Sequence, residues 1–264
     1  MANEFWWKLS SSEEEQGRLW ELYHQNSRIT RYDKPITREE LQEKTLDLII
    51  SNDYEEYPKR SLVKELSSFS CSLSEAMIRR ATARNIAPVD LSFQELSTLL
   101  FYGYGVTRTN EDNDFPHPFR TVPSAGGLYP LEIFFHQNYV PGLDAGLYHF
   151  NPVSYEIAHL IKADQTRKIQ QFLVQPDVAQ NASVLIFICA QFGRNAFKYG
   201  ERGYRFTHLE AGHVAQNINL TAQGLGLATI NIGGYIDRKA DEFLRLDGVT
   251  GSCLYIVGVG KEKT

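Results

Sequence analysis

The stretch "PSAGGLYPLEIF", Pro123 to Phe134, places a glycine pair shortly before an apolar run. Glycine pairs are typical of turns because glycine accepts backbone conformations that other residues avoid. The apolar run continues to Val140 as "LEIFFHQNYV", and its β-branched and aromatic residues indicate a strand. We therefore predict a turn that leads directly into a strand.

Outward from this stretch, five further segments have a strand-like composition and are bounded by Gly, Pro, Asn or Asp. They are "GLYHFNP" from Gly146, "YEIAHL" from Tyr155, "SVLIFICAQF" from Ser183, "LATINIGGY" from Leu227 and "SCLYIVGVG" from Ser252. Capping-box patterns "SLSE" and "SFQE" predict short helices over 73–82 and 93–102, and helical periodicity predicts others over 165–180 and 206–225. The sequence therefore predicts an α+β fold.

Composition excludes several classes of partner. The 264 residues carry a net charge of −5, and no basic block suggests a nucleic-acid or anionic-membrane partner. Cys71, Cys189 and Cys253 are scattered and lack CxxC spacing, which favours a reducing, cytoplasmic compartment. The apolar trio from Phe5 to Trp7 is followed by "SSSEEEQ", unlike a signal peptide, and "VLIFICA" from Val184 is too short to span a bilayer.

Two units are expected along the chain. Residues 1–70 are polar, acidic and partly helical, as in "ITREELQEKTLDLIIS", and form a lead-in arm that suits a docking or dimer contact. Residues 71–264 carry the chemical motifs and form the main domain.

The glycine-rich and polar motifs exclude some chemistries. "GLGLATINIGG" from Gly224 ends a helix and has Thr229 where a dinucleotide loop needs glycine, and Ser124 lacks the first glycine of a nucleophile elbow. Glu210 and His213 form one Glu-x-x-His step, but a dimetal site needs a second step, so no metal is predicted. We expect Glu210 to cap a helix from Thr207, and His213 and Asn217 to bond to neighbouring loops.

Taken together, "PSAGGLYPLEIF", "GLYHFNP", "KYGERGYR", "LEAGHVAQN" and "IGGY…LDG…LYIVGVG" resemble the nitroreductase-like flavoproteins, and within them the SagB-type dehydrogenases that oxidise azolines to azoles. The resemblance runs from about Tyr23 to the C-terminus. It implies a homodimer with a central, mostly antiparallel sheet flanked by helices and with FMN at the subunit interface.

The same resemblance implies the cofactor-binding residues. Arg80, Thr82 and Arg84 match the run that holds the FMN phosphate and ribityl chain, a role that suits guanidinium groups. In this run Ala81 stands where a second arginine or histidine is common, and Thr82 replaces serine. The residues that match the loop of the partner chain that meets the flavin are Pro123, Ser124, Ala125 and Gly126.

Three further positions complete the implied cofactor site. Gly233 and Gly234 match the backbone beside the N5 edge of the flavin ring, and Gly233 stands where simpler nitroreductases often carry glutamate. Lys261 matches a basic position near the phosphate, although a solvated tail lysine is an equal alternative.

Lys198 and Tyr199 match the catalytic pair of the azoline-oxidising branch, and the alternative is that they are two surface loop residues. Oxidation of a thiazoline or oxazoline removes a hydride and a proton, so a side chain must take the proton. We expect Lys198 to be the base and Tyr199 its partner, with the reverse assignment open. Crowding by Arg202 and Arg205, a helix N-terminus and partial burial are each expected to lower the pKa of Lys198.

The sequence leaves two other functions open. The protein could be a nitroreductase or flavin reductase that uses NAD(P)H, although the Lys-Tyr pair and the arm count against this. It could instead be a non-catalytic component of a synthetase or cyclodehydratase complex. The residues do not determine whether the azoline is a thiazoline or an oxazoline. They also do not determine whether a ribosomal peptide or a nonribosomal carrier domain carries it. The electron acceptor that the resemblance implies is molecular oxygen.

Overall fold

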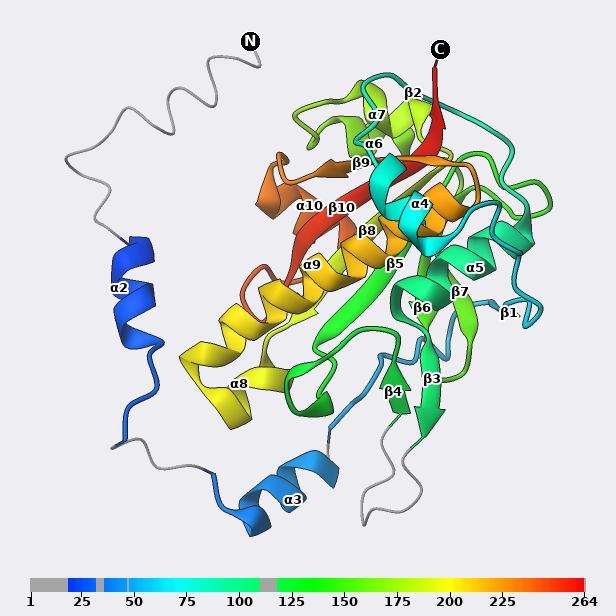
Figure 1. Cartoon of the computed structure of the whole chain (residues 1–264). Helices are drawn as coiled ribbons and strands as arrows, with labels where there is room; N and C mark the ends of the chain where they lie inside the picture. The colour runs from blue at the N-terminus through cyan, green and yellow to red at the C-terminus, as the bar shows by residue number, and fades with distance from the viewer. Residues whose placement is uncertain (1–18, 32–35, 47, 110–117, 264) are drawn as a thin grey trace.

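A computed structural model describes residues 19–31, 36–46, 48–109 and 118–263 (Figure 1). Its centre is an eight-stranded sheet in which the order β1-β7-β6-β5-β8-β10-β2 forms the main path and β9 also pairs with β10. Every ladder in this sheet is antiparallel. The strands are β1 (Lys59–Ser61), β2 (Ile86–Ala87), β5 (Leu131–Gln137), β6 (Gly146–Asn151), β7 (Glu156–Lys162), β8 (Val184–Gln191), β9 (Ala228–Ile232) and β10 (Gly251–Glu262).

Helices cover both faces of the sheet and produce three layers. One apolar core lies under α5 (Phe93–Tyr104) and α9 (Glu201–Gly224). A second core lies on the opposite face under α6 (Thr166–Gln170), α7 (Asp177–Asn181) and α10 (Asp237–Leu244). Neighbouring residues in a strand face opposite sides, so Phe134 belongs to the second core and Phe135 to the first. The prediction of an α+β fold with a mostly antiparallel sheet between helices is confirmed.

The capping boxes predicted from the sequence are present. Ser72 caps α4 (Leu73–Arg79) and Ser92 caps α5, and in both cases the glutamate three residues later bonds back to the cap. The six predicted strands all form, with trimmed ends. The structure adds the short strands β1 and β2 and a separate pair, β3 (Val106–Thr109) with β4 (Pro118–Arg120).

Two predicted helices differ from the observed ones. The segment 165–180 divides into α6 and α7 because the residues between them pair with a distant segment: the Val174 N–H donates to the Gly234 carbonyl, and Leu173 forms a bridge with Tyr235. α9 begins at Glu201 rather than near residue 206, directly after Gly200, whose φ of 54° ends α8 (Gly193–Tyr199). Thr207 therefore lies inside α9 and donates to the Gly203 carbonyl, so the prediction that it caps the helix through Glu210 is wrong.

The N-terminal arm is only partly separate from the body. In Figure 1, α2 (Leu19–Asn26) and α3 (Arg38–Leu46) lie outside the layered core, and α2 has no buried residue. The later part of the segment expected to be an arm joins the main fold, since β1 pairs with β7 and Leu62 is buried in the first core. None of the described helices is both long enough and apolar enough to cross a membrane.

Candidate active site

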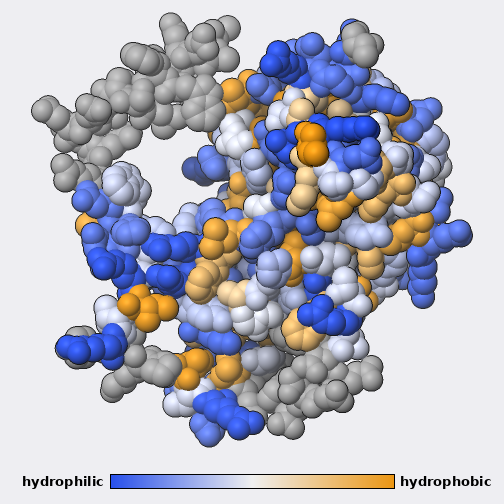
Figure 2. Space-filling view, in the orientation of Figure 1, coloured by the Kyte–Doolittle hydropathy of each residue, from blue (hydrophilic) through white to orange (hydrophobic). Residues whose placement is uncertain are grey.

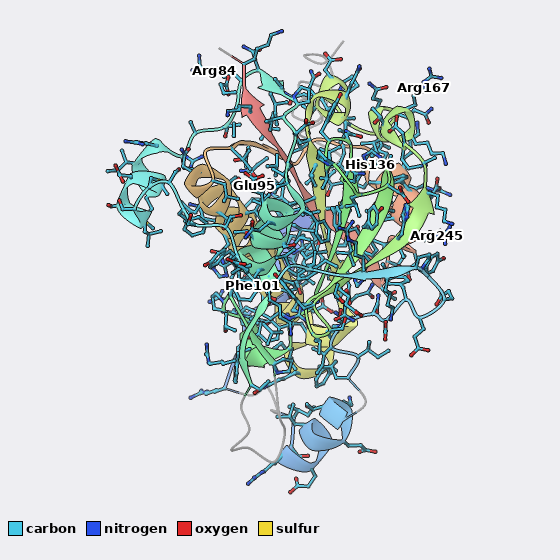
Figure 3. The ribbon with its side chains drawn as sticks, turned by 90° about the vertical axis from the view of Figure 1, so that its right-hand side faces the viewer. Arg84, Glu95, Phe101, His136, Arg167 and Arg245 are labelled. Atoms are coloured by element: carbon cyan, nitrogen blue, oxygen red, sulfur yellow. The ribbon has the colours of Figure 1, made fainter. Side chains whose placement is uncertain are left out.

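A cationic pocket of about 450 Å³ lies beside the end of α4, the last turns of α9 and the end of β10. Figure 3 shows Arg84 at this end of the molecule, near the tip of β10. The backbone after α4 is held against β9, because the Ala83 N–H donates to the Thr229 carbonyl. The pocket is lined by five of the residues predicted to hold FMN, namely Arg80, Ala81, Thr82, Arg84 and Lys261.

Two further charged residues of this pocket were not predicted as part of the site. Arg79 lines it beside Arg80, and the adjacent arginines in "RRATAR" are the signal that could have identified Arg79. The Glu262 carboxylate accepts hydrogen bonds from the backbone N–H groups of Arg84 and Asn85, each at 3.1 Å. Three arginines and a lysine against one carboxylate, with the Thr82 hydroxyl, provide the donors that a phosphate group requires.

The glycine pair after β9 leaves open space. Gly233 is exposed, and a methyl group added there would meet only Tyr255 within 4 Å, at 3.9 Å. Gly234 accepts a hydrogen bond from the Val174 N–H through its carbonyl. The surrounding chain thus does not require glycine at position 233, and the open backbone there is compatible with the close approach of a flat ligand.

Lys198 and Tyr199 lie at the end of α8, against the loop that contains Gly126. This glycine has φ of 64°, and a methyl group placed on it would lie 2.6 Å from the Tyr199 hydroxyl oxygen and 2.8 Å from Lys198 Nζ. The Lys198 Nζ also lies 5.3 Å from the centre of the Tyr199 ring. The amine and the phenol therefore converge on one point of the short 3-10 helix Ala125–Gly127, which follows Pro123 and Ser124.

Two features of the surroundings of Lys198 bear on the prediction. Lys198 lies in the last turn of α8, and α9 begins three residues later, so the expected helix N-terminus is nearby. Arg202 donates to the Ser27 carbonyl and Arg205 to the Ser27 hydroxyl, so both arginines bond to the N-terminal arm.

Replacing Gly126 with alanine is expected to reduce activity at least about 10-fold, because the new methyl group must displace the Lys198 amine and the Tyr199 hydroxyl. Gly142→Ala is the matched control, since Gly142 also has a positive φ, 77°, but nothing lies within 4 Å of the added methyl. Comparing initial rates and melting temperatures separates local displacement from backbone strain. Equal losses in both variants would contradict the contact.

A buried ionic network anchors the helix that carries Lys198. Glu132, on β5, binds Arg194 of α8 and His149 of β6, and it accepts a hydrogen bond from the Asn52 N–H at 2.9 Å. Burial alone would raise the pKa of Glu132, but His149 and Arg194 more than offset it and lower the pKa to about 2. The network therefore joins α8, the sheet and the segment around Asn52.

Glu132→Gln is expected to destabilise the protein by about 3–5 kcal/mol at neutral pH, because Arg194 is left buried without its carboxylate. The pKa of Glu132 is depressed from an ordinary 4.5 to about 2 in the folded state, so this stability is present above pH 4.5 and is lost as pH falls towards 2. Chemical denaturation of both proteins at several pH values measures the difference. A gap that stays constant down to pH 2 would refute the assignment.

The cationic pocket and the Lys198–Tyr199 pair lie at opposite ends of α9 (Figure 1). Asn219 and Gln223 line the pocket, whereas α9 begins directly after α8 at Glu201. At a rise of about 1.5 Å per residue, Glu201 and Asn219 are separated by about 27 Å along the helix. The two groups of residues are therefore far apart along this helix.

The polar face of α9 makes two contacts that bear on the site. The Asn217 side chain donates to the carbonyls of Tyr102 and Thr121, as expected for a residue bonded to neighbouring loops. Glu210 is buried and accepts a 2.6 Å hydrogen bond from the Tyr104 hydroxyl. No cluster of metal-ligating side chains is found among the described residues.

An antiparallel sheet lies between two helical layers, and a pocket lined by three arginines and a lysine lies at the end of β10. The nitroreductase family model matches residues 77–261, and the chain belongs to the nitroreductase family, whose members are oxidoreductases. This match includes nearly all of the residues described above.

Two relatives and one solved structure place the chain more closely. The nitroreductase-like protein MJ1384 of Methanocaldococcus jannaschii is 34% identical over 66% of this chain and 84% of its own length. The microcin B17-processing protein McbC of Escherichia coli is 29% identical over 52% of this chain and 52% of its own length. The chain thus aligns with about half of McbC. The E. coli microcin synthetase McbBCD complex, with truncated pro-MccB17 bound, contains a chain of the same fold, with a TM-score of 0.59, 22% identity, and coverage of 93% of this chain and 92% of that one.

Proposed function

We propose that this protein is an FMN-dependent oxidoreductase that converts a thiazoline or oxazoline ring of a peptide into the thiazole or oxazole. The observation that carries the proposal is the convergence of Lys198 Nζ and the Tyr199 hydroxyl on Gly126. The nitroreductase fold suits hydride transfer to a flavin, and the paired amine and phenol provide a side chain that can accept the proton. The peptide-processing relative McbC supports a peptide substrate.

The residues of the cationic pocket fit the cofactor. Arg80, Arg84 and Lys261 would bind the phosphate, and the Thr82 hydroxyl would donate to a phosphate or ribityl oxygen. Ala81 contributes to the wall of the pocket, and the open backbone at Gly233 and Gly234 would lie beside the ring. The chemistry that FMN supplies when bound is acceptance of a hydride at N5.

The separation of the two ends of α9 supports a homodimer. The cationic pocket lies about 27 Å along α9 from the start of this helix, which follows Lys198 of the same chain. A second copy that brings its own Pro123–Gly126 loop and Lys198–Tyr199 pair to this pocket would complete the site. The active site that we propose is therefore shared between two chains.

In this site, side chains of the protein accept and relay the proton that leaves the substrate. Lys198, as the free amine, would take the proton from the azoline ring carbon while the hydride leaves the adjacent carbon for FMN. Tyr199 would orient the ring or relay the proton, and the reverse assignment places the base on Tyr199. Two electrons and two hydrogens leave the substrate, and molecular oxygen is the acceptor that would return the flavin to its oxidised form.

The direct test is to incubate the FMN-loaded protein in air with a synthetic thiazoline peptide. We expect a product lighter than the substrate by two hydrogen atoms per ring, seen by mass spectrometry, and an azole absorbance. No change in mass with a protein that holds FMN would reject the azoline-oxidising function.

A second candidate function follows from the family itself. As an NAD(P)H-dependent nitroreductase or flavin reductase, the protein would reduce small aromatic substrates, and NADPH would bleach its flavin rapidly. A third possibility, a non-catalytic component of a synthetase complex, predicts a purified protein that cannot be loaded with FMN.

The first part of the N-terminal arm is proposed as a docking surface for the partner subunit or for the enzyme that presents the substrate. α2 contacts the start of α9 through Tyr23, whose hydroxyl donates to the Glu201 carbonyl. Its exposed apolar side chains include Leu19, Trp20 and Leu22. Deleting residues 2–31 should leave FMN bound and reduce activity on the natural substrate; full activity in the truncated protein would refute this role.

A further inference from the structure

A buried carboxyl group lies behind the loop that contacts Lys198 and Tyr199. Glu210, on α9, is 2% exposed, and its Oε1 accepts a 2.6 Å hydrogen bond from the Tyr104 hydroxyl. The same hydroxyl accepts a hydrogen bond from the Leu131 N–H, which fixes its position at the start of β5. The second oxygen, Oε2, has no hydrogen-bond partner of ordinary geometry among the described residues.

Three titratable or charged groups from other elements interact electrostatically or by a hydrogen bond with the Glu210 carboxyl. They are Tyr104 from α5, Arg120 from β4 and Tyr129 from the segment before β5. Arg120 is 4% exposed, and its guanidinium carbon lies 4.2 Å from the centre of the Tyr104 ring. Burial raises the pKa of Glu210 to about 7, although Ser124, Tyr104 and Arg120 each favour the ionised form. Glu210 can therefore gain or lose its proton near neutral pH.

Ser124 connects this carboxyl group to the Lys198–Tyr199 pair. Its hydroxyl lowers the pKa of the Glu210 carboxyl and accepts a 2.9 Å hydrogen bond from the Tyr129 N–H. The Tyr129 hydroxyl in turn accepts a 2.9 Å hydrogen bond from the Arg120 N–H, and the Arg120 guanidinium lies over the rings of both Tyr104 and Tyr129. Gly126, two residues after Ser124, is the point on which Lys198 Nζ and the Tyr199 hydroxyl converge. Ser124, which interacts with Glu210, is thus only two residues from Gly126, which contacts the Lys198–Tyr199 pair.

The charge of Glu210 changes what Ser124 can do. Beside a carboxylate, the Ser124 hydroxyl serves as a donor, whereas a protonated carboxyl can itself donate to the hydroxyl oxygen. Arg120 is attracted by the carboxylate and not by the neutral acid. Two of its nitrogens, Nε and Nη1, also lack partners of ordinary geometry among the described residues, so they are available to respond.

We propose that Glu210 is a positioning residue for the Lys198–Tyr199 pair, and that its protonation state sets how the Ser124–Gly126 turn lies against these two side chains. The proposal rests on the proposed function for its consequence in catalysis, but the coupling itself is a property of this chain without any substrate. In this arrangement Glu210 lies close to Lys198 and Tyr199 but does not itself exchange a proton with the substrate.

The coupling can be measured without activity. The protein is labelled with tyrosine that carries ¹³C at Cζ, which leaves the phenol chemically unchanged, and the ¹³C resonance of Tyr199 is assigned by its absence in a Tyr199→Phe sample. We expect this resonance to shift with pH between about pH 5.5 and pH 8.5 in the wild type. In Glu210→Gln, which keeps the shape but cannot ionise, the shift should disappear. Glu242→Gln, a change at an exposed glutamate of α10, is the matched control and should titrate like the wild type.

A second variant tests the direction in which the pKa of Glu210 changes. The Tyr104 hydrogen bond lowers the pKa of Glu210, so Tyr104→Phe should move the midpoint of the Tyr199 ¹³C shift to higher pH. A Tyr199 resonance that titrates equally in the wild type and Glu210→Gln would overturn the proposal, as would a midpoint that Tyr104→Phe leaves unmoved. If the coupling is present but no azole forms at any pH, the proposed function fails and this inference stands.

Discussion

Replacing Lys198 with alanine is expected to slow azoline oxidation by at least about 100-fold, within the range that general-base catalysis contributes. The Lys198 amine lies beside the Tyr199 hydroxyl at Gly126, where no other amine is positioned by the contacts described above. Lys198 is not among the residues that line the cationic pocket, so the variant should still bind FMN. The measurement is the rate of azole formation at saturating FMN.

Tyr199→Phe distinguishes a role of Tyr199 in proton transfer from a role in orienting the substrate ring. A loss similar to that of Lys198→Ala would favour Tyr199 as the base or as an obligatory relay, whereas a loss below about 10-fold would favour an orienting role. Lys239→Ala, on the exposed surface of α10, serves as the control for removing a lysine. A Lys198→Ala protein that is folded, holds FMN and works at the full rate would remove Lys198 from the mechanism.

The double change of Arg80 and Arg84 to alanine is expected to weaken FMN binding by at least about 100-fold, since each charged hydrogen bond contributes about 1.5–3 kcal/mol. Both side chains line the pocket whose other cation, besides Arg79, is Lys261. Quenching of flavin fluorescence during titration gives the dissociation constant, and the salt dependence of binding should fall with the loss of charge.

A matched control for this experiment is Arg167→Ala. Arg167 is an exposed arginine of α6, and Figure 3 shows it well separated from Arg84. It should bind FMN as the wild type does. Unchanged binding in the double variant would show that the cationic pocket does not hold the phosphate.

The regular part of the fold could be predicted because its signals are local. Ser72 and Ser92 precede their helices with the capping glutamate in place, and β5, β8 and β10 are long apolar strands. β1, β2, β3 and β4 have only two to four residues each, too few to show a pattern; β1 and β2 also depend on distant partners, whereas β3 and β4 pair with each other. Pairing with a distant strand leaves little trace in so short a sequence.

The candidate site was predictable to the same extent. The arginine run and Lys261 were found from their charge and from the family resemblance, and the structure brings them into one pocket. The contact of Gly126 with Lys198, and the bond between Tyr104 and Glu210, join residues far apart in the sequence. Glu210 was read as part of a helix cap because Thr207 stands three residues before it, a local pattern that the earlier start of α9 overrides.

Exposed apolar side chains on α4 are consistent with an interface at the cationic end. Leu73, Met77 and Ile78 are all exposed, and Figure 2 shows apolar surface where α4 faces the viewer. α4 ends at Arg79, beside the pocket that the proposed dimer must bring to a second copy. Burial of these side chains against the partner would stabilise the shared site.

The proposed reaction is best tested by anaerobic mixing of the FMN-loaded protein with a thiazoline peptide while the flavin absorbance is followed. We expect the yellow absorbance to bleach with the thiazoline peptide and to stay unchanged with NADPH, and the flavin of Lys198→Ala to bleach at least about 100-fold more slowly. Bleaching with NADPH alone, and none with the thiazoline peptide, would contradict the proposed reaction.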